Sequence, residues 1–396
     1  MNTKLIINLV ISVILIVYVL VNPPFFFADT VPTIFRLSIE LILMLILFSF
    51  FLFGQYIQKN IIIFIGLAVV SFSIIQLMEG NNIIDHVAFF NKIIVLLLIM
   101  QVFINKPTLL NFFTRFWIRF SKAISIMTIF AFVGYILGLV DYQPYQFSEL
   151  RYVLSNYFLG HISPRNYIIS IPAISGYMFE PVYLGFFYGL NVVISRQLID
   201  DCDERSRFIA LNLVAGLFTF SITYYLFFGF YFLISVIRNR TYKFRMVDIG
   251  TRIIIFVSVA LLLIFLFLYL DILNLSSLDQ RISRMAIYQD ILKNKNFLEF
   301  LLGNGVGWYK SYTNIGIDST ILAMLIERGA LITVVSVILI YTITKHNVLL
   351  IMLIIIYSSV IPLNNFVLFY IMIGLQYALY KQSIIINNSF CRQYTV

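Results

Sequence analysis

The chain has little charge. Only 11% of its 396 residues are Asp, Glu, Lys or Arg, whereas soluble globular proteins have about 25%. Apolar residues make up 61% of the sequence. This balance excludes the soluble class and predicts an integral membrane protein. Because no polar stretch is long enough to fold by itself, residues 1–396 are expected to form a single polytopic domain.

Cysteine and histidine are also scarce, with two and three residues respectively. The sequence has no metal-ligand spacing such as His-x-x-x-His and no Walker or Rossmann glycine pattern. We therefore predict no disulfide framework, no metal and no cofactor, so an enzyme of this kind must use energy stored in its substrate. The net charge of +9 is divided among short loops, which favours a topology signal over a nucleic-acid partner.

Long apolar runs are abundant. A membrane-spanning helix needs about 20 apolar residues, and the runs predict an all-α protein with about 12 transmembrane helices. The spans are expected near residues 5–21, 33–53, 61–78, 87–104, 123–140, 171–195, 208–221, 222–237, 249–270, 319–343, 348–363 and 366–380.

Two segments are less regular. The apolar stretch at 208–237 is long for one helix and short for two, and the polar residues 219–223 in its middle indicate a break. Such a break is tolerated only where it faces protein or a wet cavity. Basic and aromatic residues alternate over 106–122, which predicts an amphipathic helix lying on anionic lipid.

Lysine and arginine suggest the orientation. With a cytosolic N-terminus, 17 of the 27 cations fall on the cytosolic side, seven fall outside, and three lie near or within spans. This bias predicts cytosolic termini and two larger outer loops, at 141–170 and 271–317. The seven outer cations oppose the topology rule, which indicates a functional role for them. They are Arg151, Arg165, Arg281, Arg284, Lys293, Lys295 and Lys310.

The second outer loop combines cations with a glycine-rich turn. Apolar residues at helical spacing within 281–300 predict a short surface helix, on which Arg281 and Arg284 share a face. The run Gly303-Asn304-Gly305-Val306-Gly307 predicts a tight turn whose backbone NH groups can bind an anion. Asp318 is expected to cap the following span, and it could also orient a cation of the loop.

The first outer loop and the span after it supply candidate bases. Glu180 lies near membrane depth and precedes Pro181, so it is a general base, a partner for an arginine, or a helix-start residue stabilised by the dipole. His161 is either a base or a solvent-facing loop residue. Arg151 and Arg165 are suited to grip phosphate with paired hydrogen bonds.

Four motifs in order resemble the Wzy-type O-antigen and capsular polysaccharide polymerases, which share a fold family with the O-antigen ligases. They are Met178-Phe179-Glu180-Pro181, Thr219-Phe220-Ser221, the glycine run 303–307, and Asp318 with Glu327 and Gly329. The chain departs from the family pattern at Val182, Ile222 and Ser319, where relatives often carry a small polar residue, Arg and Asn.

The resemblance implies an enzyme of the bacterial cytoplasmic membrane. Its substrate would be an oligosaccharide on undecaprenyl pyrophosphate, and a chain-length regulator protein would be a partner alongside membrane lipid. The growing glycan would pass to the next lipid-linked repeat unit. As hypotheses, the four outer arginines bind pyrophosphate or position the acceptor, Glu180 or His161 is the base, Gly305 shapes the loop over the site, and Asp318 anchors that loop.

Three other functions fit parts of this pattern. A ligase would share the leaving group but transfer the finished chain to lipid A core. A flippase for lipid-linked sugar predicts cations along a path between the spans. A membrane scaffold predicts that substitutions of the outer arginines have no effect.

Overall fold

The structure is a computed structural model that describes residues 3–52, 83–146, 152–164, 172–239, 276–305, 308–313 and 319–393. The described chain is mostly helical, as predicted. Two helical segments, Pro107–Ile136 and Thr320–Thr344, are long and apolar enough to cross a membrane by length and composition. The spans predicted at 61–78 and 249–270 lie outside the described residues.

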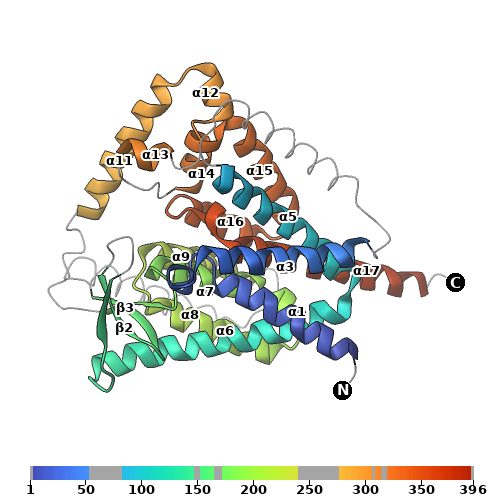
Figure 1. Ribbon diagram of the computed structural model, residues 1–396. Coiled ribbons are helices and arrows are strands. Elements are labelled where there is room, and N and C mark those ends of the chain that lie inside the picture. Colours follow the sequence, from blue (N-terminus) through green and yellow to red (C-terminus); the bar gives the residue numbers. More distant parts are fainter. Residues whose placement is uncertain are drawn as a thin grey trace.

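The first half of the chain forms long helices and one small sheet. The helices are α1 (Thr3–Leu20), α2 (Phe27–Thr30), α3 (Thr33–Leu52), α5 (Ile83–Asn105), α6 (Pro107–Ile136), α7 (Pro181–Leu198), α8 (Cys202–Leu217) and α9 (Ile222–Asn239). Figure 1 shows the sheet at one end of the molecule and both chain termini at the other. We call these the sheet end and the terminal end.

The second half of the chain is entirely helical in the part that the structure describes. Its helices are α11 (Ser276–Asn294), α12 (Phe297–Leu302), α13 (Trp308–Thr313), α14 (Thr320–Ala323), the π-helix η1 (Met324–Arg328), α15 (Gly329–Thr344), α16 (Val348–Ser358), the 3₁₀-helix η2 (Leu363–Asn365) and α17 (Val367–Gln393). Helix α11 begins before the surface helix that the sequence predicted at 281–300.

The segment predicted as the first outer loop, together with residues 172–176, forms a four-stranded antiparallel sheet, so the chain is mostly but not entirely helical. Its strands pair in sequence order and are β1 (Gln143–Gln146), β2 (Tyr152–Asn156), β3 (Gly160–Pro164) and β4 (Pro172–Gly176). The β2–β3 turn is stabilised by Asn156, whose Oδ1 accepts from the backbone NH groups of Phe158 and Leu159 at 3.0 and 3.1 Å. Because β4 occupies 172–176, the helix expected from 171 begins at Pro181 instead.

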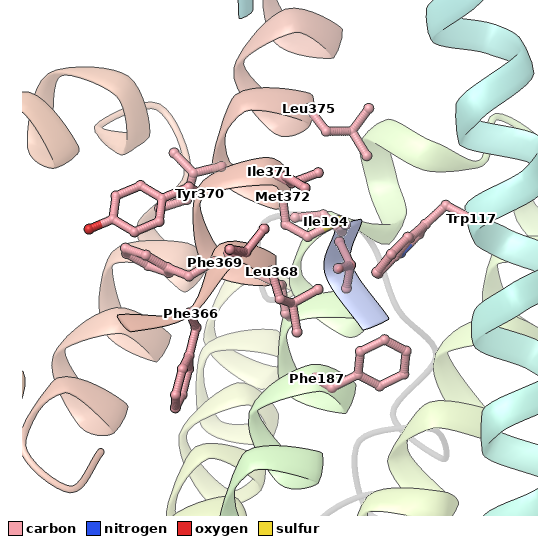
Figure 2. Close-up of a cluster of buried hydrophobic side chains, with 14 of the residues drawn as sticks. Trp117, Phe187, Ile194, Phe366, Leu368, Phe369, Tyr370, Ile371, Met372 and Leu375 are labelled. Atoms are coloured by element: carbon pink, nitrogen blue, oxygen red, sulfur yellow. The ribbon is translucent and has the colours of Figure 1, made fainter. Parts of the chain in front are cut away.

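The core lies around α7 and the first half of α17. Fifteen of the residues of α7 are buried, as expected for a helix that other elements surround on all sides. Figure 2 shows Phe187 and Ile194 of α7 between Trp117 of α6 and a group of α17 side chains that includes Leu368 and Met372.

Buried polar groups join α6, α7 and α8. Trp117 Nε1 donates to Asn191 Oδ1 at 2.9 Å, and Asn191 Nδ2 donates to Asn212 Oδ1 at 3.0 Å. Such interhelical hydrogen bonds stabilise packing between apolar helices. The prediction that 106–122 lies on the membrane surface is also corrected. Residues 107–122 form the first part of α6, and their Phe113 and Trp117 are fully buried in protein.

The break predicted within 208–237 is confirmed. Helix α8 ends at Leu217 and α9 begins at Ile222, with Phe220 between them at a positive φ of 45°. Thr219 is fully buried and its Oγ1 donates to Gly216 O at 2.7 Å. Ser221 and Thr223 are buried as well, so the polar residues of the break face protein.

Candidate functional site

The motif Met178-Phe179-Glu180-Pro181, here called the Glu180 motif, is fixed by the loop that follows α1. The Phe179 NH donates to Pro24 O at 3.0 Å, and the Phe26 NH donates to Tyr177 O at 3.0 Å. One backbone bond just before the motif and one within it therefore hold it at the sheet end. Sequence spacing gives no sign of this contact, because about 150 residues separate the two segments.

Glu180 is the residue that starts α7. Its backbone is extended, with φ −141° and ψ 152°, and Pro181 occupies the first turn of the helix. Proline suits this position because the first NH groups of a helix have no partner within it. The Glu180 carboxylate forms no cap hydrogen bond with its own helix, and it is half-buried. Glu180 therefore places a carboxylate at the start of α7 in a residue that is partly accessible.

His161 lies on β3 in an aromatic cluster at the same end. Its ring packs edge-on against Phe26, with 4.6 Å between ring centroids, and stacks on Tyr145 at 5.7 Å. The side chain is only 2% exposed. Burial lowers the pKa of His161 from 6.5 to about 4, because a low-dielectric environment disfavours the charged ring.

The sheet brings His161 close to the Glu180 motif. Strands β3 and β4 pair His161 with Gly176, and the ring of Tyr177 lies 6.1 Å from that of Phe26. His161 and the Glu180 motif, which supply the two bases proposed from the sequence, thus both contact the loop that follows α1. Only Glu180 has an exposed surface in this arrangement, whereas the imidazole of His161 is enclosed by protein.

The glycine-rich turn binds the π-helix η1. The Asn304 NH donates to Ile326 O at 3.0 Å, and the Gly305 NH donates to Glu327 O at 2.9 Å. Gly303 and Gly329 have φ values of 88° and 78°, in a region that essentially only glycine adopts. The NH groups of Asn304 and Gly305 therefore bond carbonyl groups of η1. In this structure, these two bonds hold the turn in place.

Lys295 completes this junction. Its Nζ donates to Ile326 O at 2.7 Å and reaches Glu299 O at 3.4 Å. A π-helix interrupts the regular i to i−4 bonding of an α-helix and is often found at functional sites. Here, carbonyl groups of η1 accept hydrogen bonds from Lys295 and from the glycine-rich turn.

A second, smaller core attaches α11 to the same junction. It consists of Tyr288 and Ile291 of α11, Tyr309 of α13 and Ile326 of η1, with 5.2 Å between the two tyrosine ring centroids. Arg281 and Arg284 lie three residues apart in α11, so the helix prediction for this loop is confirmed. The helix that carries both arginines is thereby positioned against the glycine-rich turn.

Three of the proposed site residues, Arg151, Arg165 and Asp318, lie outside the described residues. One expectation about Asp318 is nevertheless corrected. The residue that caps the following helix is Ser319, whose side chain accepts from the Leu322 NH at 3.5 Å. Ser319 is one of the positions at which the chain departs from the family pattern.

Arg328 emerges as a further residue of interest. It is the last residue of η1 and is only 4% exposed. Its guanidinium lies 3.9 Å from the centre of the Phe89 ring, a cation–π contact that stabilises a desolvated charge. The sequence signal for Arg328 was its position between Glu327 and Gly329, and the sequence does not reveal Phe89 as its partner.

Comparison with known proteins identifies no relative: no protein-family model, no curated protein and no solved structure matches the chain.

Proposed function

We propose that the chain is a polysaccharide polymerase of the Wzy type in the bacterial cytoplasmic membrane. In this proposal about 12 helices cross the membrane, both termini are cytosolic, and the sheet end faces outward. The enzyme transfers a growing glycan from undecaprenyl pyrophosphate to a sugar hydroxyl of the next lipid-linked repeat unit.

One observation carries the proposal: two motifs of the resemblance are bonded to each other, and the segments that lead into the other two are bonded as well. The glycine-rich turn is bonded to the Glu327–Gly329 segment. Strand β4, which leads into the Glu180 motif, donates through the Ile174 NH to Phe218 O at 3.1 Å, next to Thr219-Phe220-Ser221. Unrelated matches of short patterns would have no reason to pair in space, so the motifs behave as parts of one structural plan.

The chemistry follows from charge. As the bond between the sugar anomeric carbon and its pyrophosphate oxygen breaks, negative charge grows on the leaving group. Arginines held nearby stabilise that charge more in the transition state than in the ground state. We assign this role to Arg281 and Arg284 of α11, together with Arg151 and Arg165. One such contact typically contributes about 10²–10³ in rate.

Glu180 is the base in this proposal. The acceptor hydroxyl forms the new bond to the anomeric carbon as its proton passes to the carboxylate, which later releases the proton to solvent. A positioned base contributes about 10²–10⁴ in rate. Glu180 is preferred to His161 because the carboxylate is half-buried and accessible, whereas the imidazole is 2% exposed.

The experiment compares charge removal at the two ends of the protein. Glu180→Gln and Arg281→Ala should abolish long-chain glycan in a null strain while the protein still inserts at normal amounts. Asp200→Asn and Arg207→Ala are the matched controls, because both residues are exposed and lie beyond the far end of α7. Normal glycan length in the Glu180 and Arg281 variants would refute the assignment.

The null strain separates the polymerase from the alternatives. A polymerase defect leaves single repeat units attached to the final acceptor, whereas a ligase defect leaves full-length polymer on its lipid carrier. A flippase defect traps repeat units on the cytosolic side. Each outcome is read from the lipid-linked species that accumulate.

A further inference from the structure

A cavity of about 230 Å³ lies among α15, α16, α17 and α5. Its walls include Thr320 and Asn364 near one end and Thr344 and Ile351 near the other. Thr320 and Thr344 are the first and last residues of the apolar helical segment that is long enough to cross a membrane, so residues from both ends of that segment line the cavity.

The walls of the cavity are apolar even where the sequence shows hydroxyl residues. Thr333 Oγ1 donates to Gly329 O at 2.7 Å, Thr344 Oγ1 donates to Ile340 O at 2.7 Å, and Ser358 Oγ donates to Ile355 O at 3.0 Å. Each of these hydroxyls is bonded to its own helix, which leaves methyl and methylene groups to face the cavity. The space suits a hydrocarbon and offers little to a polar ligand.

The rim of the cavity is exposed on the side of the helices. Val337 and Tyr341 of α15 and Ile355 of α16 line the cavity and are 52%, 58% and 62% exposed. If the helices span the membrane, these side chains face the acyl chains of the bilayer. An occupant would then enter sideways from lipid.

The described residues that line the cavity are uncharged, but a cation lies close to one part of it. Met324 of η1 lines the cavity, and Arg328, which is buried over the Phe89 ring, is the last residue of the same short helix. Arg328 is followed directly by α15 and belongs to the junction with the glycine-rich turn. A hydrocarbon chain in the cavity would therefore have a cation and the candidate site near one of its ends, which favours an amphiphile with an anionic head.

We propose that the cavity binds the polyprenyl chain of the lipid-linked donor, with its phosphate end toward η1. This inference rests on the proposed function. A polyprenyl phosphate has one chain, whereas a phospholipid has two. A cavity of about 230 Å³ is smaller than the roughly 300–1,000 Å³ of a pocket that encloses a whole drug-sized ligand. It therefore holds a segment of one chain, and the remainder lies in the bilayer.

Two valines of α15 provide a matched test. Val337 lines the cavity and Val334, one turn away, does not, yet their exposures are 52% and 55%. The full chain is placed in phospholipid nanodiscs that contain undecaprenyl monophosphate. With benzoylphenylalanine at position 337 or 334, light-induced cross-linking followed by mass spectrometry identifies the captured lipid. Capture of the polyprenyl lipid at 337 should exceed capture at 334 by about tenfold.

A second measurement uses binding alone. Val337→Trp should weaken retention of undecaprenyl monophosphate by about tenfold because an indole fills the rim, while Val334→Trp leaves retention unchanged. Equal capture at both positions, capture of phospholipid only, or no capture would overturn the proposal. Neither assay requires turnover, so polyprenyl capture at 337 supports the cavity even in a chain that makes no polymer. Conversely, normal polymerisation without capture rejects the cavity and leaves the proposed function intact.

Discussion

The crossing of the glycine-rich turn and η1 leaves no room for a single added methyl group. A Cβ at Gly303 would lie 2.5 Å from Glu327 O and 2.6 Å from the Arg328 carbonyl carbon. Both atoms belong to the backbone, so no side chain can rotate away. The Gly303 backbone, at φ 88° and ψ 175°, is also strained for any other residue.

The magnitude of Gly303→Ala follows from these two terms. A non-glycine residue in this conformational region costs about 1–3 kcal/mol. Displacing well-packed neighbours costs about 1–3 kcal/mol more. We therefore expect a loss of about 2–6 kcal/mol, a large part of the 5–15 kcal/mol that typically separates folded from unfolded protein. The junction should open and expose the segment around 303–305.

Gly229→Ala is the matched control. Gly229 lies within α9, and a Cβ there would meet nothing within 4 Å, so the change should be neutral or stabilise by about 0.5–1 kcal/mol. Thermal unfolding in detergent and limited proteolysis near 303 measure the difference. If Gly303→Ala unfolds at the same temperature as Gly229→Ala and is cleaved no faster, the described crossing is incorrect.

Three further changes test other parts of the fold. Asn191→Leu should reduce stability by about 1–3 kcal/mol in thermal unfolding, because Trp117 Nε1 and Asn212 Oδ1 would lose their bonds to Asn191; an unchanged transition would contradict the polar network. The pKa of His161 falls from 6.5 in the unfolded chain to about 4 in the folded one, so the unfolded state binds more protons between these values and stability decreases as the pH falls. At about 1.4 kcal/mol per pH unit, the free energy of unfolding falls by about 3 kcal/mol over this range. His161→Phe should remove this pH dependence when unfolding is measured from pH 7 to 4. If the pH dependence persists in the variant, it belongs to other groups. Lys295→Met should destabilise the η1 junction by about 1.5–3 kcal/mol, because the Ile326 carbonyl loses a charged donor. Limited proteolysis near residue 303 measures this effect. Cleavage no faster than in the unchanged protein would show that the bond is dispensable.

Among the described residues, most long apolar runs form helices, although the run expected from 171 begins with strand β4. The break at 218–221 was also predictable, because polar residues interrupt an apolar stretch. The sheet was not, since its strands have only four or five residues and prolines at positions 144, 164 and 172, which sequence patterns associate with loops. Trp117 shows a second limit: aromatic residues among cations suggest a membrane surface, yet burial was decided by Asn191, 74 residues away.

The candidate site shows a similar division. The sequence identified Glu180 and the glycine-rich turn, because proline and glycine restrict the backbone in recognisable ways. It suggested anion-binding NH groups at 303–307, whereas the NH groups of Asn304 and Gly305 bond to η1. That outcome depends on tertiary partners about 20 residues further along the chain, which local patterns do not specify.

Four cations in the second half of the chain fall into two groups according to their position. Lys295 bonds a π-helix carbonyl and Arg328 packs over Phe89, so both charges stabilise the junction that holds the turn. Arg281 and Arg284 lie on α11, which the same junction positions through Tyr288 and Ile326. A leaving pyrophosphate needs cations that are already in place before the bond breaks. In the proposed polymerase, the arginines of α11 are therefore the cations that we assign to the leaving pyrophosphate.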